Sequence, residues 1–230
     1  TLSSAYMYSQ EVNFGLSLGT GLSNQTLQSS NSPYTAGQTW NTIGGLPYRV
    51  DPYLGYNAGL MIELFFDLST TDIDEKVKKS KIGIKSGINY SSQGVTVEDV
   101  NMTRFENNLT YLQIPILIDY KIKNFNFFIG PQIHLLQDFT TTETRSSNLS
   151  SNATSQNPDF KFEKRYFEDS DPNFVFGIGY EVYDGLSIQI KSLRSLKNIT
   201  NIEGEEWKNK SFELTLNYVL TNIKRTIVIW

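Results

Sequence analysis

Residues 111–122 have the sequence Tyr-Leu-Gln-Ile-Pro-Ile-Leu-Ile-Asp-Tyr-Lys-Ile, in which every even-numbered residue from Leu112 to Ile122 is apolar. The odd-numbered positions include Gln113, Asp119 and Lys121. Neighbouring side chains of a β-strand point to opposite faces. One face of this segment is therefore apolar, and the other carries an amide, a carboxylate and an ammonium group.

The same alternation recurs along the chain. Seven further segments, each about ten residues long or a little longer, also have one continuous apolar face. They are residues 11–23, 53–68, 81–90, 125–136, 173–183, 186–195 and 211–220. Together with 111–122 they predict eight strands and an all-β fold.

Composition narrows the class of protein. The chain has 230 residues and a net charge of −4, which gives no reason to expect a nucleic-acid partner. It has no cysteine, so disulfides and thiolate metal sites are excluded. No apolar run approaches the roughly 18–20 residues that a membrane helix needs. We expect residues 1–230 to form a single domain, with the strands within about 11–220.

Two architectures fit eight such strands. In a soluble sandwich or lipocalin-like barrel the apolar face is the core, whereas in a transmembrane barrel it meets lipid and the polar face fills the interior. The glycines favour the second, because they fall almost wholly on the polar faces. They are Gly15, Gly19, Gly21, Gly59, Gly83, Gly87, Gly130, Gly177 and Gly179. Glycine weakens a strand that faces water, but it makes room inside a narrow eight-stranded barrel.

The polar faces also carry charges of both signs. They are Glu63, Lys85, Asp119, Lys121, Glu181, Lys191 and Glu213. Buried charges need partners, so we predict that these side chains pair across the lumen. Such an interior is a plug of side chains and not an open pore.

The connections alternate in length. Lys123-Asn124 and Asp184-Gly185 are short, and the second pair is a hairpin signal of the type I′ kind. The segment 69–80 is longer and charged, and residues 24–52, 91–110, 137–172 and 196–210 form long connections. Outer-membrane barrels have short periplasmic turns and long extracellular loops. We therefore predict an up-and-down barrel with long extracellular loops and both termini periplasmic.

Aromatic residues occupy outward positions near the predicted strand ends. They are Tyr56, Phe66, Tyr90, Tyr120, Phe125, Tyr180 and Tyr218. This placement is typical of the aromatic girdle at a membrane interface. The alternative is that aromatic residues simply favour strands.

The order of these segments resembles the PorT-like outer-membrane β-barrel family of Bacteroidota, from about Val12 to Leu220. The motifs that carry the resemblance are Phe14-Gly15-Leu16 with Gly19, Tyr111-Leu112-Gln113-Ile114-Pro115, Phe128-Ile129-Gly130-Pro131-Gln132, Phe176-Gly177-Ile178-Gly179-Tyr180 and Leu196-Lys197-Asn198-Ile199. The resemblance implies an eight-stranded barrel in a Gram-negative outer membrane. It implies little about activity, beyond accessory roles of a few members in secretion or assembly machines.

The chain departs from the family pattern at its end. Residues 221–230 follow the last predicted strand and include Ile227-Val228-Ile229-Trp230. One interpretation is a periplasmic tail that docks on a partner, and the other is that the eighth strand runs longer.

Candidate catalytic and metal-binding groups are few. His134 is the only histidine and lies at an inward position, where a hydrogen-bonded interior role fits it better than catalysis. Asp72, Asp74 and Glu75 lack the spacing of a calcium loop, and Asp169 and Asp171 also favour a solvated loop. The Asn-x-Ser/Thr triplets at Asn148 and Asn152 lie in an Asn- and Ser-rich loop. We therefore predict no catalytic residue, no metal and no cofactor.

The long connections carry aromatic residues, which either anchor partners or pack together to cap the barrel. They are Tyr34, Trp40, Tyr48, Phe105, Phe160, Phe162, Tyr166, Phe167 and Trp207. The sequence predicts a non-enzymatic outer-membrane barrel whose partners are outer-membrane lipids and other envelope proteins, as an accessory subunit of a larger complex. The alternatives are a lipid-modifying enzyme and a small-solute channel.

Overall fold

The computed structural model describes residues 6–29, 41–43, 46–68, 80–99, 104–144, 164–201 and 203–229. Its strands are β1 (Tyr6–Ser29), β2 (Asn41–Ile43), β3 (Leu46–Asp67), β4 (Ser80–Asp99), β5 (Arg104–Ile122), β6 (Phe125–Thr144), β7 (Ser170–Tyr183), β8 (Leu186–Ser195) and β9 (Glu205–Ile229). One 3₁₀ turn, η2 (Lys164–Tyr166), precedes β7. Among these residues, no helix is long and apolar enough to cross a membrane.

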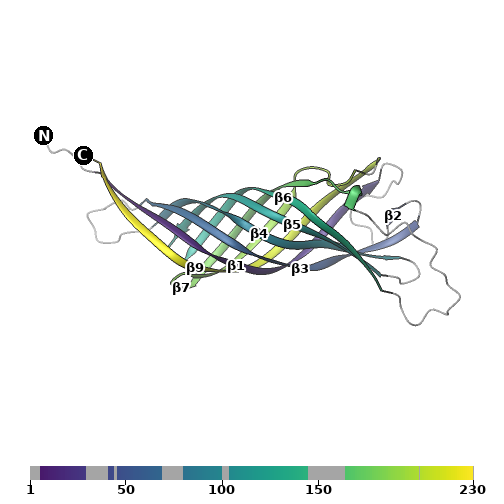
Figure 1. Cartoon of the computed structure of the whole chain (residues 1–230), viewed down its shortest axis with the longest axis horizontal. Helices are drawn as coiled ribbons and strands as arrows, with labels where there is room; N and C mark the ends of the chain where they lie inside the picture. Colours follow the sequence, from purple (N-terminus) through teal and green to yellow (C-terminus); the bar gives the residue numbers. More distant parts are fainter. Residues whose placement is uncertain are drawn as a thin grey trace.

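Eight of the strands close into a ring. Each strand from β3 to β9 pairs antiparallel with the next, and β1 pairs with both β9 and β3. The strands are steeply tilted around one elongated barrel (Figure 1). The three-residue β2 pairs only with the start of β3 and stands outside the ring. The predicted eight-stranded, up-and-down antiparallel barrel is confirmed.

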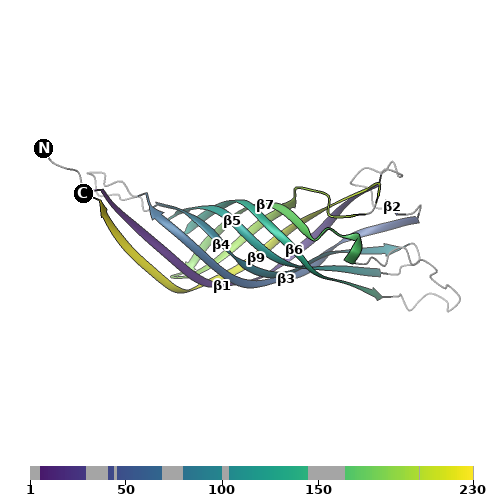
Figure 2. The same cartoon turned by 45° about the horizontal axis from the view of Figure 1, so that its top comes forward.

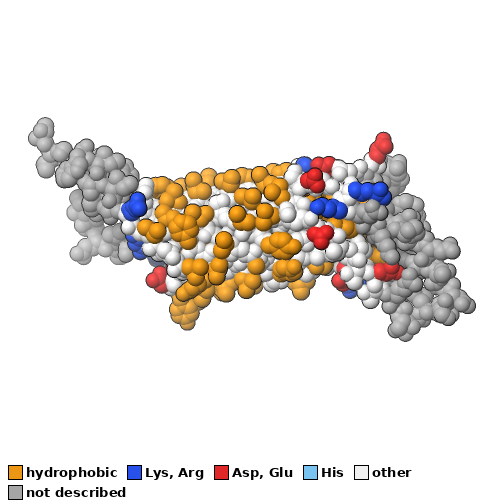
Figure 3. Space-filling view, in the orientation of Figure 1, with side chains coloured by type: hydrophobic (Ala, Val, Ile, Leu, Met, Phe, Trp, Pro, Cys, Tyr) orange, Lys and Arg blue, Asp and Glu red, His pale blue; other side chains and the backbone are white. Residues whose placement is uncertain are grey.

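The apolar faces of the strands point away from the barrel axis. Exposed leucine, isoleucine and phenylalanine side chains alternate with buried polar ones along each strand, as with Leu214 and Leu216 on either side of Thr215. On the face seen in Figure 3, hydrophobic side chains form a band across the middle of the molecule, with charged residues toward both ends. Of the two architectures that fit the sequence, the structure therefore has the one with its apolar face outside.

The strands extend further at the long-loop end than the sequence predicts. β4 runs to Asp99 and β5 begins at Arg104, although residues 91–110 were expected to form a loop. β3, β6 and β9 are also longer at this end, whereas β8 has the predicted bounds. The sequence pattern misses these extensions because the apolar side chains change from the outer to the inner face of the strand. Phe105 and Leu109 point inward and are buried, whereas Ile116 and Ile118 in the same strand point outward. The alternation thus reverses beyond the apolar band.

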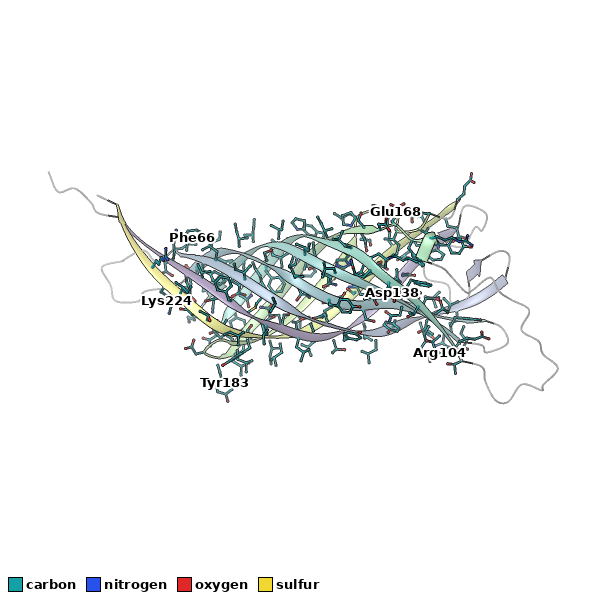
Figure 4. The ribbon with its side chains drawn as sticks, viewed as in Figure 1. Phe66, Arg104, Asp138, Glu168, Tyr183 and Lys224 are labelled. Carbon is teal, nitrogen blue, oxygen red and sulfur yellow. The ribbon has the colours of Figure 1, made fainter. Side chains whose placement is uncertain are left out.

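The two ends of the barrel differ as expected. Phe66, Tyr183 and Lys224 lie at one end, and Arg104, Asp138 and Glu168 lie at the other (Figure 4). The strand ends that lead to both termini are at the short-turn end (Figure 1). The predicted hairpin at Asp184-Gly185 is present, but it is not of type I′. Gly185 has a φ of 77°, and Asp184 does not have a positive φ.

A two-stranded ribbon projects from the short-turn end (Figure 2). β3 pairs with β1 only from Gln10 onward, and β8 pairs with β9 only as far as Tyr218. Beyond these points β1 and β9 continue to pair with each other up to Tyr6 and Ile229. Residues 221–229 therefore continue the last strand, as the second interpretation of the chain's end proposed.

Candidate functional site

A cavity of about 260 Å³ opens into the barrel interior at the short-turn end. Its wall includes carboxylates and ammonium groups from several strands, and the Asp184-Gly185 turn lies at its mouth. Further along the interior, two cavities of about 20 and 10 Å³ are separate from it. Each holds at most about one water molecule. Among the described residues, the interior is thus filled by side chains and these cavities do not join into a channel.

Six of the seven interior charges predicted from the sequence form ion pairs. Lys85 Nζ lies 3.2 Å from Glu63 Oε1, and Lys191 Nζ lies 2.9 Å from Glu213 Oε2. Both pairs join neighbouring strands along the wall. Lys121 on β5 and Glu181 on β7 also form an ion pair, with Nζ 2.5 Å from Oε2, and β6 lies between these two strands. Ion pairing is therefore confirmed for six of the seven residues. The prediction that they pair across the lumen is wrong for these ion pairs, because they join strands that are adjacent or separated by one strand.

Glu213 is the point where the interior network crosses the barrel. Its Oε2 accepts a hydrogen bond of 2.9 Å from Asn57 on β3, and its Oε1 accepts one of 3.2 Å from Gln93 on β4. Lys85 adds a second crossing by donating to Gln189 Oε1 at 2.8 Å. A buried carboxylate is stable only with several partners. Since these partners come from strands on other sides of the barrel, the contacts join the opposite walls.

Asp119 is the exception among the interior charges. It is fully buried, and it has no ion-pair partner within the described ranges. The amide of Asn126 donates to both of its carboxylate oxygens, at 3.3 and 3.1 Å. Asp119 also lines the cavity at the short-turn end.

The inward glycines leave the space that these side chains fill. A Cβ atom on Gly177 would lie inside contact distance of the Phe128 ring, and one on Gly21 would lie 2.8 Å from Glu213 Cγ. Real Cβ atoms do not approach other atoms so closely. The predicted role of the glycines, to make room inside a narrow barrel, is confirmed.

His134 lies inside the barrel and is fully buried. Its Nε2 atom shares a 2.7 Å hydrogen bond with Gln132 Nε2, and the centroid of its ring lies 5.3 Å from the centroid of the Tyr111 ring. Asp171 is its cross-strand neighbour, but the hydroxyl of Ser195 donates to Asp171 at 2.6 Å and not to His134. A serine is therefore nearby without being activated by the histidine, and the arrangement fits a hydrogen-bonded interior residue.

A network around Asp171 was not predicted from the sequence. Asn209 donates to Asp171 Oδ2 at 2.9 Å and to the Tyr111 hydroxyl at 3.1 Å. Asp171 was expected in a solvated loop, but it is fully buried, which corrects that expectation, whereas Asp169 is exposed. The inward position of Asp171 follows from the start of β7 at Ser170, which the sequence pattern did not mark.

An apolar cap closes the long-loop end of the barrel. We use this name for the buried residues Val95, Val97, Phe105, Leu109, Tyr111, Leu136, Phe167, Ile199 and Trp207. Phe167 and Trp207 meet edge to face, with ring centroids 5.7 Å apart. Backbone hydrogen bonds tie the segment around Phe167 to the one around Ile199, including Glu168 N to Ile199 O at 2.9 Å.

The cap decides between the two roles proposed for three of the long-connection aromatics. Phe105, Phe167 and Trp207 belong to it, and Tyr166 packs against it. Tyr34, Trp40, Phe160 and Phe162 lie outside the described residues, as does the side chain of Tyr48.

The remaining candidates for a metal or modification site lie where the structure gives no description. Asp72, Asp74, Glu75, Asn148 and Asn152 lie outside the described residues. Within the part of the chain that the structure describes, no three histidine, aspartate or glutamate residues converge as a metal site would require.

The outward aromatics follow the predicted girdle. Tyr56, Tyr90, Tyr120, Tyr180 and Tyr218 are all exposed on the outer wall, and Phe125 lies edge to face against Tyr180. Tyrosine at the border of an apolar band is typical of a membrane interface. The outer wall has the features of a surface that meets lipid.

Comparison with protein families agrees with this geometry. The family described as outer membrane protein beta-barrel domain matches residues 8–201. The chain belongs to this family. Membership of the outer membrane protein beta-barrel domain family places the chain in the bacterial outer membrane. The match does not distinguish the PorT-like group of Bacteroidota, which stays a prediction.

Solved structures of other outer-membrane proteins are similar at low identity. Neisserial surface protein A is 8% identical, with 94% of this chain and 99% of that chain covered and a TM-score of 0.36. OprG from Pseudomonas aeruginosa is 10% identical, with 94% and 95% covered and a TM-score of 0.34. Ail of Yersinia pestis is 7% identical, with 91% and 98% covered and a TM-score of 0.27. No curated protein matches the chain.

Proposed function

We propose that the chain is a non-enzymatic outer-membrane barrel of the PorT-like type that serves as an accessory subunit of a larger envelope complex for secretion, assembly or uptake. Its lipid-facing wall holds it in the outer membrane, with the long loops outside and both termini in the periplasm. Its partners are outer-membrane lipids and other envelope proteins.

The observation that carries this proposal is the ribbon of β1 and β9. From Thr221 to Ile229, β9 pairs with β1 on one side and with no described strand on the other. An unpaired strand edge is a template for an added strand. In the proposed orientation this edge lies in the periplasm, where an extended segment of a partner protein can pair with it.

The filled interior supports the same proposal. In the part of the chain that the structure describes, the ion-paired plug and the apolar cap leave no continuous path for a solute, and His134 is fully buried inside the barrel. Function is therefore assigned to the surfaces that the barrel presents.

The test is a co-purification from outer membranes in mild detergent. The ribbon variant replaces Ile227, Val228 and Ile229 with serine and keeps Trp230. The matched control replaces Thr140 and Thr142, exposed near the opposite end of β6, with serine. We expect the wild type and the control to retain the same partner and the ribbon variant to lose it. Retention by the ribbon variant, with its barrel folded, contradicts docking through the ribbon.

The enzymatic alternative is tested separately. His134→Gln removes the only histidine, and lipid A from cells that carry this variant is compared with lipid A from wild-type cells by mass spectrometry. We expect identical lipid A. A modification that disappears with His134→Gln, while the variant is still present in the membrane, contradicts a non-enzymatic role.

A further inference from the structure

Two cations lie side by side on the outer wall. Arg194 on β8 and Lys210 on β9 are directly opposite each other in the antiparallel register. Both side chains are exposed, whereas the residues on either side of them in each strand are buried inside the barrel. Arg194 and Lys210 therefore point outward together.

Four other cations at this end of the barrel form ion pairs with acidic residues. These pairs are Arg49–Asp51 at 2.9 Å, Arg104–Glu106 at 3.4 Å, Lys197–Glu168 at 3.1 Å and Lys208–Glu206 at 2.5 Å. Arg194 and Lys210 have no ion-pair or hydrogen-bond partner among the described residues. Like charges directly opposite each other destabilise a sheet. The pair thus costs stability in the chain alone and gains it from an anion that binds both residues.

The position of the pair selects the kind of anion. Phe174 is the β7 neighbour of Arg194 in the same row, and the next row toward the middle of the barrel is Phe176, Ser192 and Phe212. These phenylalanines are exposed on the lipid-facing wall. The two cations therefore lie where the apolar band ends, at the level of lipid headgroups, and their long side chains reach the charged layer from there.

We propose that Arg194 and Lys210 bind a phosphate of a lipid A headgroup, the phosphorylated glycolipid of the outer leaflet. Arginine and lysine are the residues that bind phosphate, through charge-assisted hydrogen bonds. The acyl chains of the same molecule lie along Phe174, Phe176 and Phe212, which a free phosphate ion cannot use. The site rests on the proposed orientation, with the long-loop end outside.

The test uses the full chain, refolded in detergent without lipid and titrated with defined lipids by native mass spectrometry. The probes are bisphosphorylated lipid A, the same lipid A after dephosphorylation, phosphatidylglycerol and inorganic phosphate. We expect bisphosphorylated lipid A to bind most tightly. Arg194→Gln/Lys210→Gln lowers that affinity about tenfold or more, because two charge-assisted hydrogen bonds are lost. The control Arg49→Gln/Arg104→Gln removes two cations that already have acidic partners, and it leaves the affinity unchanged.

Three results overturn the proposal. They are unchanged affinity in Arg194→Gln/Lys210→Gln, equal binding of dephosphorylated lipid A or phosphatidylglycerol, and competition by inorganic phosphate at the concentration of the lipid.

The orientation of the barrel in the membrane is measured independently with single introduced cysteines. This is possible because the chain has no cysteine of its own. Thr142→Cys, at the long-loop end, reacts with a membrane-impermeant thiol reagent on intact cells, whereas Asp184→Cys, at the short-turn end, reacts only after lysis. The reverse pattern overturns the assignment to lipid A and also the periplasmic placement of the ribbon. Whether the ribbon binds a partner at all is decided separately, by the co-purification of the ribbon variant.

Discussion

Lys191 Nζ lies 2.9 Å from Glu213 Oε2 inside the barrel, and the two residues come from neighbouring strands. Glu213 is buried and the Lys191 side chain is largely so. The same carboxylate accepts hydrogen bonds from Asn57 and Gln93. One glutamate therefore joins strands that the backbone ladder leaves on separate parts of the wall. The interior network therefore depends on Glu213 keeping these partners.

Removing Glu213 should destabilise the barrel more than removing an exposed partner. In Glu213→Leu the largely buried ammonium of Lys191 keeps no anionic partner, and we expect the free energy of unfolding to fall by about 3–5 kcal/mol. Glu206→Gln removes the partner of Lys208 at the surface and should cost less than about 1 kcal/mol. Equilibrium urea unfolding in phospholipid vesicles measures both. Equal small losses for the two variants would show that the interior network does not stabilise the fold.

A side chain at Gly177 should not fit. In Gly177→Val the new methyl groups meet the Phe128 ring, and we expect a loss of at least about 1–3 kcal/mol in the free energy of unfolding. Phe128→Leu in the same chain should recover part of that loss. The control Ile178→Val changes the adjacent residue, which points outward, and should stay within about 0.5 kcal/mol of wild type. If the Gly177→Val barrel is as stable as wild type without the Phe128→Leu substitution, the interior is not tightly filled.

The barrel should not conduct. Both the ion-paired interior and the apolar cap close it, so the double variant Phe167→Ala/Trp207→Ala, which thins the cap alone, should be as silent as wild type in planar bilayers. A porin in the same bilayers is the positive control. A steady, clear current from the wild-type chain would contradict the filled interior and favour the channel alternative.

The part of the fold that meets lipid could be predicted from the sequence, and the part beyond it could not. Between Leu112 and Ile122 every outward residue is apolar, so alternation is unbroken. Beyond the band, water replaces lipid outside and the cap replaces the polar plug inside. Phe105 and Leu109 therefore have the opposite parity to Ile116 and Ile118, and the strand resembles a loop in sequence.

The interior chemistry was predictable in type but not in detail. Charges of both signs on the inward faces indicate that ion pairs form, because buried charges need partners. Glu213 is the crossing point because it contacts Gln93 and Asn57, which are 120 and 156 positions away from it in the sequence. The buried position of Asp171 depends on where β7 begins. A single sequence carries no signal for either.

The outward direction of the apolar face is tested most directly by depth-dependent quenching. A fluorophore on Leu216→Cys, in the middle of the apolar band, is compared with the same fluorophore on Thr142→Cys in vesicles. We predict that brominated acyl chains quench the label at position 216 and that aqueous iodide quenches the label at position 142. Iodide quenching at position 216 without quenching by bromine, in a chain that stays in solution without detergent, would contradict the account.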